Sequence, residues 1–234
     1  MRDGQKRTEA RKKKEHEERK KSILNAARET FFEKGFMAAT MDGIAEACYL
    51  AKGTLYLYFK SKEELYFSIM AEGVALLKKD FDTIPSLLLP ADLLLEEVLK
   101  TYYAFYERNP KYFRIVFLSS QPDFRERVPE DLLRKCIEEG RACLQVVSDV
   151  IEKGIKSGVF RNMDAWTAAN ILWSTVNGIV MNYEQGALHR DEILRLPLQE
   201  MLHEALDLAV NGLRSGSRQR RRRSISQCDP VSEV

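Results

Sequence analysis

The side chains that most often perform catalysis or bind metals are few in this sequence of 234 residues. The three histidines, His16, His189 and His203, have no cysteine or second histidine at a ligand spacing. Nucleophile-elbow, phosphate-loop and paired-histidine zinc motifs are also missing from the sequence. Cys136 and Cys143 share one face of an expected helix, which favours buried structural thiols over a redox or metal sensor. We therefore expect no enzyme, no catalytic residue, no metal site and no cofactor.

Charge suggests binding rather than catalysis. Residues 1–62 carry 15 Lys and Arg against 9 Asp and Glu, residues 63–213 carry 16 against 24, and residues 214–234 carry 6 against 2. The formal net charge of +2 hides this division. A basic beginning joined to an acidic body predicts that one end meets a polyanion, with nucleic acid as the leading candidate.

The elements that position these groups are helices, since apolar residues recur at helical spacing and no alternating strand pair is present. We predict an all-α fold of about nine helices, near residues 17–34, 41–47, 51–57, 62–80, 92–108, 110–118, 130–157, 164–185 and 198–213. Thr40 and Ser61 are the expected N-caps of two of them, and Glu64 completes a capping box. The charged beginning lacks the apolar run of a signal peptide and no segment is apolar enough to span a membrane, so the expected location is cytoplasmic.

Two short helices joined by a tight turn and packed on a longer helix predict a helix-turn-helix, whose second helix enters the major groove of DNA. The segments Thr40–Ala47 (TMDGIAEA) and Ala51–Leu65 (AKGTLYLYFKSKEEL), with the preceding residues 26–36, closely resemble the DNA-binding domain of TetR/AcrR-family transcriptional regulators. The resemblance covers roughly residues 20–66. It implies a two-domain bacterial homodimer, here with the DNA-binding domain at 17–62 and a ligand-binding and dimerisation domain at 63–213. The charged composition of the two ends predicts a flexible basic arm at 1–16 and a disordered basic tail at 214–234.

The expected function is therefore a ligand-responsive regulator, a repressor in the family's common mode, which binds a near-palindromic operator and is released by a lipophilic or aromatic small molecule. A helical interaction or redox-sensing protein with weakened DNA binding is the alternative. Leu55 and Phe59 are expected to face inward. The residues expected to contact DNA are Thr40, Lys52, Gly53, Thr54, Tyr56, Tyr58, Lys60 and Lys62.

The sequence departs from the family pattern at the turn. Tyr49 replaces a turn glycine that commonly needs a positive φ, and Ala51 replaces the N-cap serine, at a cost of about 1 kcal/mol each. In an alternative interpretation, Tyr49 has an ordinary backbone conformation and offers its phenol to DNA.

The body carries a dense aromatic set that suits either a core or a small-molecule pocket. The residues expected to bind ligand are Tyr102, Phe105, Tyr106, Phe113, Phe117, Trp173 and Asn177. Arg108, Lys111 and Arg114 leave room for an anionic head group. The family pairs through its two C-terminal helices, which here present Ile171, Val176, Ile179, Val180, Leu202, Leu206, Leu208, Ala209 and Leu213.

The basic ends admit two interpretations. Residues 2–21, with 10 basic and 5 acidic side chains, form either an arm in the minor groove or a solvated extension. The run from Arg220 to Arg223 is either inert or a nonspecific electrostatic aid to binding.

Overall fold

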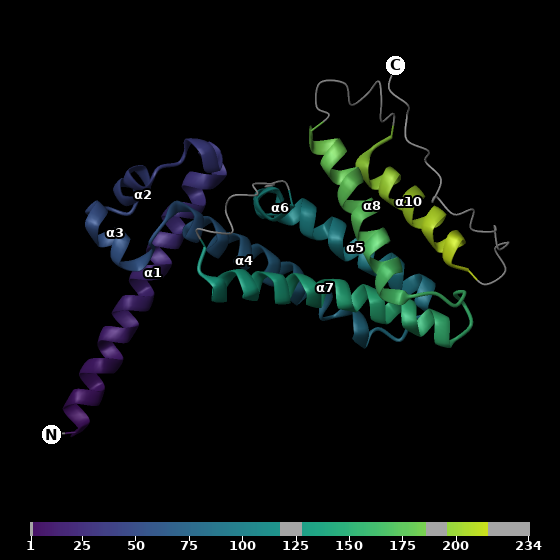
Figure 1. Ribbon diagram of the computed structural model, residues 1–234, viewed down its shortest axis with the longest axis horizontal. Coiled ribbons are helices and arrows are strands. Elements are labelled where there is room, and N and C mark those ends of the chain that lie inside the picture. The colour runs from purple at the N-terminus through teal and green to yellow at the C-terminus, as the bar shows by residue number, and fades with distance from the viewer. Residues whose placement is uncertain (1, 118–127, 186–195, 215–234) are drawn as a thin grey trace, which may run out of the picture.

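The computed structural model describes residues 2–117, 128–185 and 196–214. Within these ranges the chain forms nine α-helices and a short 3-10 turn, which confirms the all-α prediction (Figure 1). The helices are α1 (Arg2–Ala38), α2 (Met41–Ala47), α3 (Lys52–Tyr58), α4 (Lys62–Phe81), α5 (Ala91–Arg108), α6 (Pro110–Phe117), α7 (Glu130–Lys156), α8 (Ala165–Gln185) and α10 (Leu198–Leu213), with the turn at Ile84–Ser86. No helix in these ranges has the length and apolarity that a bilayer crossing needs.

Helices α1 to α3 and the beginning of α4 form a small domain at one end of the molecule (Figure 1). Its core contains Ile23, Ile44, Leu55 and Phe59, each with at most 1% of its surface exposed. Ile115 of α6 and Cys136 of α7 join the same core from the larger domain. The two domains therefore share apolar contacts as well as α4.

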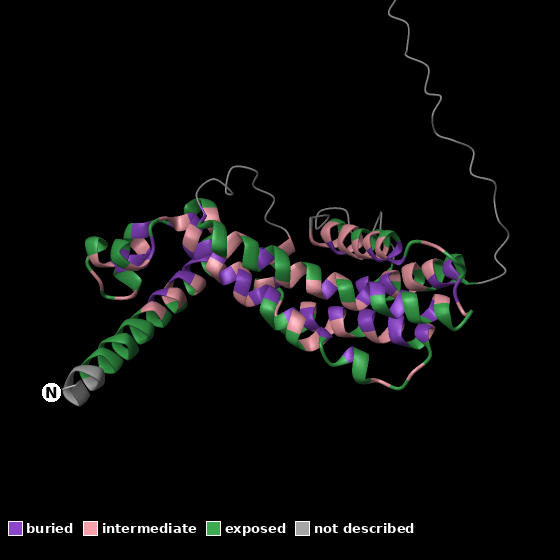
Figure 2. Ribbon diagram, turned by 60° about the horizontal axis from the view of Figure 1, so that its bottom comes forward, coloured by how far each residue is buried: buried purple, intermediate pink, exposed green. Residues whose placement is uncertain are grey.

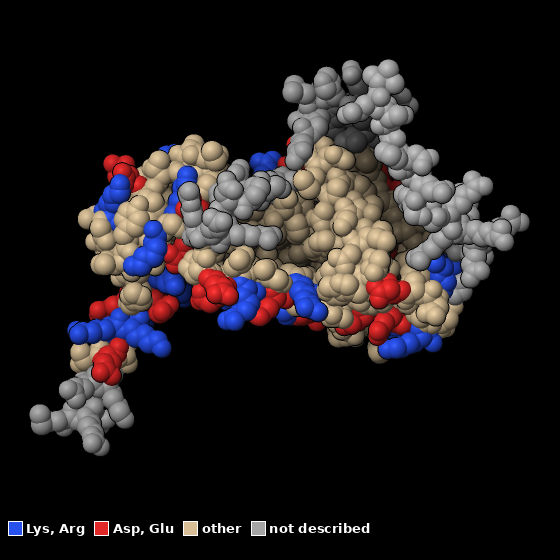
Figure 3. Space-filling view, in the orientation of Figure 1, with Lys and Arg blue, Asp and Glu red and all other residues tan. Residues whose placement is uncertain are grey.

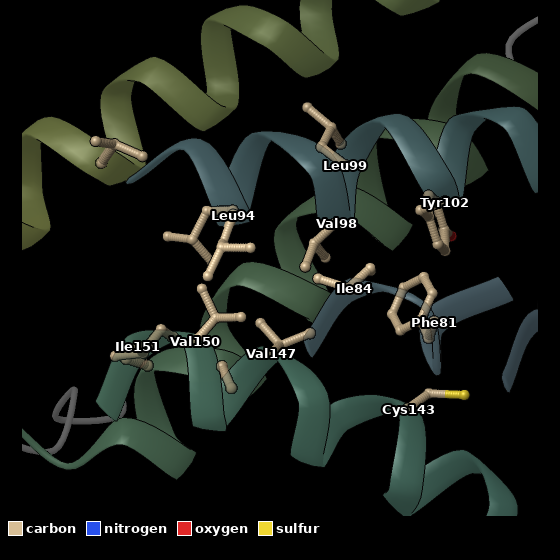
Figure 4. Packing of buried hydrophobic residues seen from close by; sticks show 14 of the residues in the cluster. Phe81, Ile84, Leu94, Val98, Leu99, Tyr102, Cys143, Val147, Val150 and Ile151 are labelled. Atoms are coloured by element: carbon tan, nitrogen blue, oxygen red, sulfur yellow. The ribbon is translucent and has the colours of Figure 1, made fainter. Parts of the chain in front are cut away.

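The larger domain is built around the packing of α5 on α7. Leu94 and Val98 of α5 point toward Val147 and Val150 of α7, with Phe81 and Ile84 nearby, whereas Leu99 lies on the side of α5 away from α7 (Figure 4). Helices α8 and α10 cover this pair, and α4 packs along α7. Because α4 also packs on α1, it connects the small domain to the body.

Local signals placed most helix ends within one or two residues, but the beginning of α1 differs from the prediction. The helix starts at Arg2 rather than near Glu17, so the segment expected to be a flexible arm is helical. Its Glu, Lys and Arg residues are strong helix formers, and ion pairs such as Arg11–Glu15 link successive turns. Gly35 interrupts the helix with a φ of 72°, directly after the predicted end at residue 34, and the helix then resumes to Ala38. Of the expected basic tail, residues 215–234 lie outside the described residues.

Candidate nucleic-acid interface and ligand cavity

The turn between α2 and α3 is a Schellman motif centred on Tyr49. The Leu50 amide donates to the Ala45 carbonyl at 2.9 Å, and the Tyr49 amide donates to the Glu46 carbonyl at 3.0 Å. This pair of bonds requires a left-handed residue after the helix, a position that usually holds glycine. Tyr49 has a φ of 54° and is the non-glycine residue with positive φ in the described chain. The expectation of positive φ is confirmed, and the ordinary backbone of the alternative interpretation is wrong. The Tyr49 side chain is 96% exposed.

The two short helices begin with different caps. The Thr40 hydroxyl accepts a hydrogen bond from the Gly43 amide at 3.1 Å, so Thr40 caps α2 as predicted. Ala51 begins α3 in an extended conformation without a side-chain cap, as its methyl group requires. The first amides of α3 therefore keep donor capacity for a bound anion.

The two sides of α3 differ in burial. Leu55 and Phe59 are buried, as predicted. Lys52 and Gly53 are exposed at the beginning of the helix, and Tyr56 is 37% exposed one turn later. A Cβ atom added to Gly53 would meet nothing within 4 Å, so this end of α3 has open space for a partner.

Lys52 is the exposed cation at the beginning of α3. Its ammonium lies 2.7 Å from a carboxylate oxygen of Asp42, and the hydrogen bond to Asp42 raises the pKa of Lys52. Both side chains are largely exposed, and exposed ion pairs are weak. Lys52 is therefore charged at neutral pH and can exchange Asp42 for a phosphate at little cost.

Tyr58 connects the end of α3 to α1. Its ring stacks on His16, with centroids 4.6 Å apart and planes inclined by 23°. Next to it, the Lys20 ammonium lies 5.5 Å from the centroid of the Phe59 ring. The half-buried Tyr58 therefore also positions the N-terminal part of α1.

The two lysines near the beginning of α4 have different environments. Ser61 and Glu64 form the expected cap, with the Glu64 amide 3.0 Å from the Ser61 hydroxyl. The Lys62 ammonium donates to the Phe36 carbonyl at 2.8 Å and to the Ala39 carbonyl at 2.9 Å. Lys62, expected to contact phosphate, is thus occupied with the end of α1. Lys60 is exposed, and its ammonium donates to the carbonyl of Tyr56 at 3.0 Å.

A polar triad joins the two domains. The Glu72 carboxylate of α4 accepts a hydrogen bond from Arg28 of α1 at 2.8 Å and another from the Tyr112 hydroxyl of α6 at 3.0 Å. Burial and the nearby Glu72 raise the pKa of Tyr112 to about 12, so its hydroxyl remains a donor at neutral pH. At the next residue, a Cβ added to Gly73 would lie 2.8 Å from a methyl of Val116. Helices α4 and α6 are therefore in close contact at this junction.

Residues of the larger domain that the structure describes line two cavities. One, of about 600 Å³, is bounded by α4, α6, α7 and α8. The other is a narrow apolar pocket of about 50 Å³ bounded mainly by α5, α8 and α10. The larger volume lies in the range of about 300–1,000 Å³ that is typical of small-molecule sites.

The residues expected to bind ligand divide among the two cavities and the core. Phe117 and Trp173 line the larger cavity, and Tyr102 and Trp173 line the smaller pocket. Phe105 and Phe113 line neither, because both side chains are completely buried in the core. An apolar helical face alone does not distinguish a cavity wall from a packed core.

The polar members of the expected set are bonded to one another or to neighbouring helices. The Tyr102 hydroxyl donates to the Asn177 side-chain oxygen at 2.6 Å, and the Tyr106 hydroxyl donates to Glu184. Burial raises the pKa of Tyr102 strongly. These groups fix α5 against α8, so they hold the cavity walls in place.

Several lining residues were not predicted as ligand contacts. They come mainly from α7 and include Gly140, Arg141 and Leu144. Arg141 lies over the ring of Trp166 at 5.5 Å and forms no ion pair with a described acidic residue. The spacing of apolar residues along α7 indicated a buried face, but it carried no sign of a cavity.

The two cysteines of α7 are structural in their environment. Both are buried, and burial raises the pKa of Cys136 to about 11 and that of Cys143 to about 12. Such thiols are poor nucleophiles at neutral pH. Among the described residues no group of three potential ligands could hold a metal ion.

A helix-turn-helix with an exposed cationic and phenolic face, joined by α4 to a helical domain with a ligand-sized cavity, defines a DNA-binding transcriptional regulator. The chain belongs to the tetR family. Residues 23–69 match the family described as bacterial regulatory proteins, tetR family. Residues 95–208 match the tetracyclin repressor-like C-terminal domain.

Known relatives agree with this assignment. The uncharacterized HTH-type transcriptional regulator YhgD of Bacillus subtilis (strain 168) is 28% identical over 169 residues, which cover 72% of this chain and 85% of the relative. The crystal structure of the transcriptional regulator FadR from Bacillus subtilis in complex with stearoyl-CoA aligns with a TM-score of 0.65 and 22% identity, covering 82% of this chain and 98% of that one. The TetR family transcriptional regulator PfmR from Thermus thermophilus aligns with a TM-score of 0.62 and 22% identity, covering 82% and 99%. The last two comparisons concern the fold alone.

Proposed function

We propose that this protein is a ligand-responsive repressor that binds a near-palindromic operator as a homodimer and leaves it when a lipophilic small molecule occupies the larger cavity. The observation that carries the proposal is the position of this cavity beside α4 and α6. Helix α4 also packs on α1 of the DNA-binding domain, and the Glu72 triad ties α1 to α6. A ligand that favours one arrangement of these helices therefore changes the affinity for DNA.

The DNA-binding face in this proposal is the outward side of α3 with the caps beside it. Its members are Thr40, Lys52, Gly53, Thr54, Tyr56, Tyr58 and Lys60. Lys52 supplies an exchangeable cation, and the space around Gly53 allows close approach to base edges. Lys62 does not join this set, because its ammonium is bonded to two carbonyls at the end of α1.

The proposed dimer interface is formed by α8 and α10. Ile171 is 62% exposed and Leu208 is 75% exposed. The surface over α8 is nearly free of charged side chains, in contrast to the charged edge along α7 (Figure 3). Three residues of the set expected to form the interface, Val180, Leu202 and Leu213, are instead buried within the protomer. They pack beneath the exposed surface of α8 and α10.

The proposed effector is a lipophilic molecule with an anionic head. The cavity walls are mainly apolar, and among the described residues that line them Arg141 is the cation. None of the three basic residues expected near a head group lines this cavity: Arg108 pairs with Asp80 at 2.8 Å, Arg114 pairs with Glu184 at 3.1 Å, and the exposed Lys111 lies 5.4 Å from the centroid of the Phe32 ring. The structural relative that binds stearoyl-CoA supports an acyl thioester as the first compound to test.

The effector test uses stearoyl-CoA, with coenzyme A as the head-group control. An operator is first selected from random-sequence duplexes, and binding is followed by fluorescence anisotropy. Stearoyl-CoA is expected to weaken operator binding about 5–150-fold, the usual range of allosteric coupling. Coenzyme A alone is expected to have no such effect. Operator binding that is unchanged by saturating stearoyl-CoA refutes this class of effector.

A matched pair of variants locates the effector. A Cβ at Gly140 meets nothing within 4 Å, so G140L projects a side chain into the cavity without a backbone clash, whereas G140A adds a single methyl group. G140L is expected to abolish the response to stearoyl-CoA while operator binding persists, and G140A is expected to retain the response. Equal responses would place the effector elsewhere.

The dimer test uses sedimentation equilibrium and the same operator. L208E places a charge on the proposed interface, whereas L93E alters an exposed leucine of α5, which is 44% exposed. We expect L208E to be monomeric with weakened operator binding, and L93E to be dimeric. A dimeric L208E with full affinity would exclude α10 from the interface.

A further inference from the structure

The N-terminal part of α1 projects beyond the domain that it begins. Its first completely buried residue is Ile23, and residues 8–19 are all exposed (Figure 2). Both ribbon views show this extension leaving the end of the molecule that carries α2 and α3 (Figures 1 and 2). A helix that is polar on every side is not held by core packing. Its exposed surface is therefore free to meet a partner.

Two contacts fix the orientation of the extension relative to the recognition helix. His16 stacks on Tyr58, and Lys20 lies over Phe59, both at the end of α3. Arg19 lies close enough to the turn after α2 for its charge to lower the pKa of the Cys48 thiol, which burial raises. The side of the extension around His16 is therefore continuous with the side of the domain that carries α3.

The basic residues of the extension fall on two different faces. Successive residues of an α-helix are rotated by about 100°, so Lys12, Lys13, Arg19 and Lys20 all lie within about 60° of His16. We name these four residues the basic stripe. None of these four residues forms an ion pair with a described acidic residue. Within residues 8–21, Glu9 is the acidic residue that lies on the same side of the helix as His16.

On the opposite face, two basic residues are already paired with acidic ones. Arg11 lies 3.4 Å from Glu15, and Lys14 lies 3.8 Å from Glu18. The pairing of acidic with basic residues on this face leaves an excess of positive charge on the face of His16. Helix stability does not explain this asymmetry, because acidic residues one turn away from the basic stripe would have stabilised the helix there as well.

We infer that the basic stripe binds the phosphate backbone of duplex DNA beside the base pairs that α3 contacts. From Lys12 to Lys20 the helix rises about 12 Å, which matches three or four phosphates of one strand at about 3.4 Å along the DNA axis. Lysine ammonium groups supply point charges to phosphate rather than base recognition. The stripe thus adds affinity and length to the footprint without adding sequence preference. The inference rests on the proposed DNA-binding function.

The test compares two double variants that remove the same charge from the same exposed helix. K12Q/K13Q alters the basic stripe, and R11Q/K14Q alters the paired face. Glutamine keeps a helix propensity close to that of lysine and arginine. Circular dichroism at 222 nm checks that both variants keep the helix content of the parent protein.

Affinity is measured by anisotropy between 50 and about 300 mM KCl, on a selected operator with long flanks and on a duplex cut close to the half-sites. Loss of two phosphate contacts per protomer is expected to reduce the slope of log affinity against log salt by about 1.8 per protomer. K12Q/K13Q should show this reduction on the long duplex and little on the short one, and R11Q/K14Q should show little on either.

The inference is overturned if the two variants have equal effects, or if K12Q/K13Q keeps the salt slope of the parent protein. The second result is also the one expected if the basic stripe binds an acidic protein instead of DNA. If the parent protein selects no operator and binds no duplex, the proposed function itself fails. The two failures are therefore distinguishable in one set of titrations.

Discussion

Replacement of Tyr49 by glycine is expected to stabilise the protein. Tyr49 occupies the left-handed position of the Schellman motif with a φ of 54°. A residue with a Cβ pays about 1–2 kcal/mol for this conformation, whereas glycine adopts it freely. Because the side chain is 96% exposed, its removal costs almost no packing.

The net effect is smaller than the strain that is relieved. Glycine gains about 0.5–1 kcal/mol of conformational entropy in the unfolded chain. The expected gain in unfolding free energy is therefore about 0.5–1 kcal/mol. For a chain of this size, 1 kcal/mol shifts Tm by about 2–4 °C, so Y49G should raise Tm by about 1–4 °C.

The assay is thermal unfolding followed by circular dichroism at 222 nm, with Y49A as the matched control. Y49A removes the same ring but keeps the Cβ, so its stability should stay within about 0.5 kcal/mol of the parent. If Y49G and Y49A have the same Tm, the turn stores no strain and the reasoning is refuted. Operator affinity gives a second result: a phenol that contacts DNA predicts equal losses in both variants.

Three further predictions follow from buried contacts of the larger domain. G154A should lower the unfolding free energy by about 1–3 kcal/mol, because its Cβ would lie 2.0 Å from the Phe160 ring, whereas G140A on the same helix should be neutral or stabilising by up to about 1 kcal/mol; a thermal melt of each checks the difference. Burial raises the pKa of Cys143 to about 12, so above about pH 9 the thiol ionises in the unfolded state before it does in the folded one, and the unfolding free energy falls as pH rises. Urea titrations between pH 9 and 11 should therefore show that the parent protein loses roughly 1.4 kcal/mol per pH unit more than C143A does. Parallel pH profiles of the two proteins would refute this prediction. Y112F removes the hydroxyl that bonds Glu72 and should cost about 1 kcal/mol in denaturant unfolding, whereas an unchanged midpoint would show that the junction does not depend on this bond.

Most of the helices could be predicted from the sequence because their signals are local. Thr40 and Ser61 cap helices through amides only three residues away. Prolines and glycines mark the ends of the later helices within one or two residues. The strained turn was also predictable, because the requirement for positive φ depends on the backbone path at Tyr49 and not on distant contacts.

The beginning of α1 was missed for a related reason. The sequence of residues 2–16 is highly charged, and high charge is typical of both solvated helices and disordered segments. The contacts that orient the helix, such as His16 on Tyr58, join residues far apart in the chain. Helical spacing cannot reveal them.

The sequence by itself determined the all-helical fold, the helix-turn-helix and the outward positions of α3, since periodicity and capping are properties of a single segment. Only the tertiary structure decided which partner each side chain has. Phe113 is packed in the core while Phe117, four residues later, lines a cavity, and the Lys62 ammonium is bonded to two carbonyls at the end of α1. Periodicity assigns a residue to a face of its helix, whereas the neighbouring helices determine whether that face meets a core, a cavity or solvent.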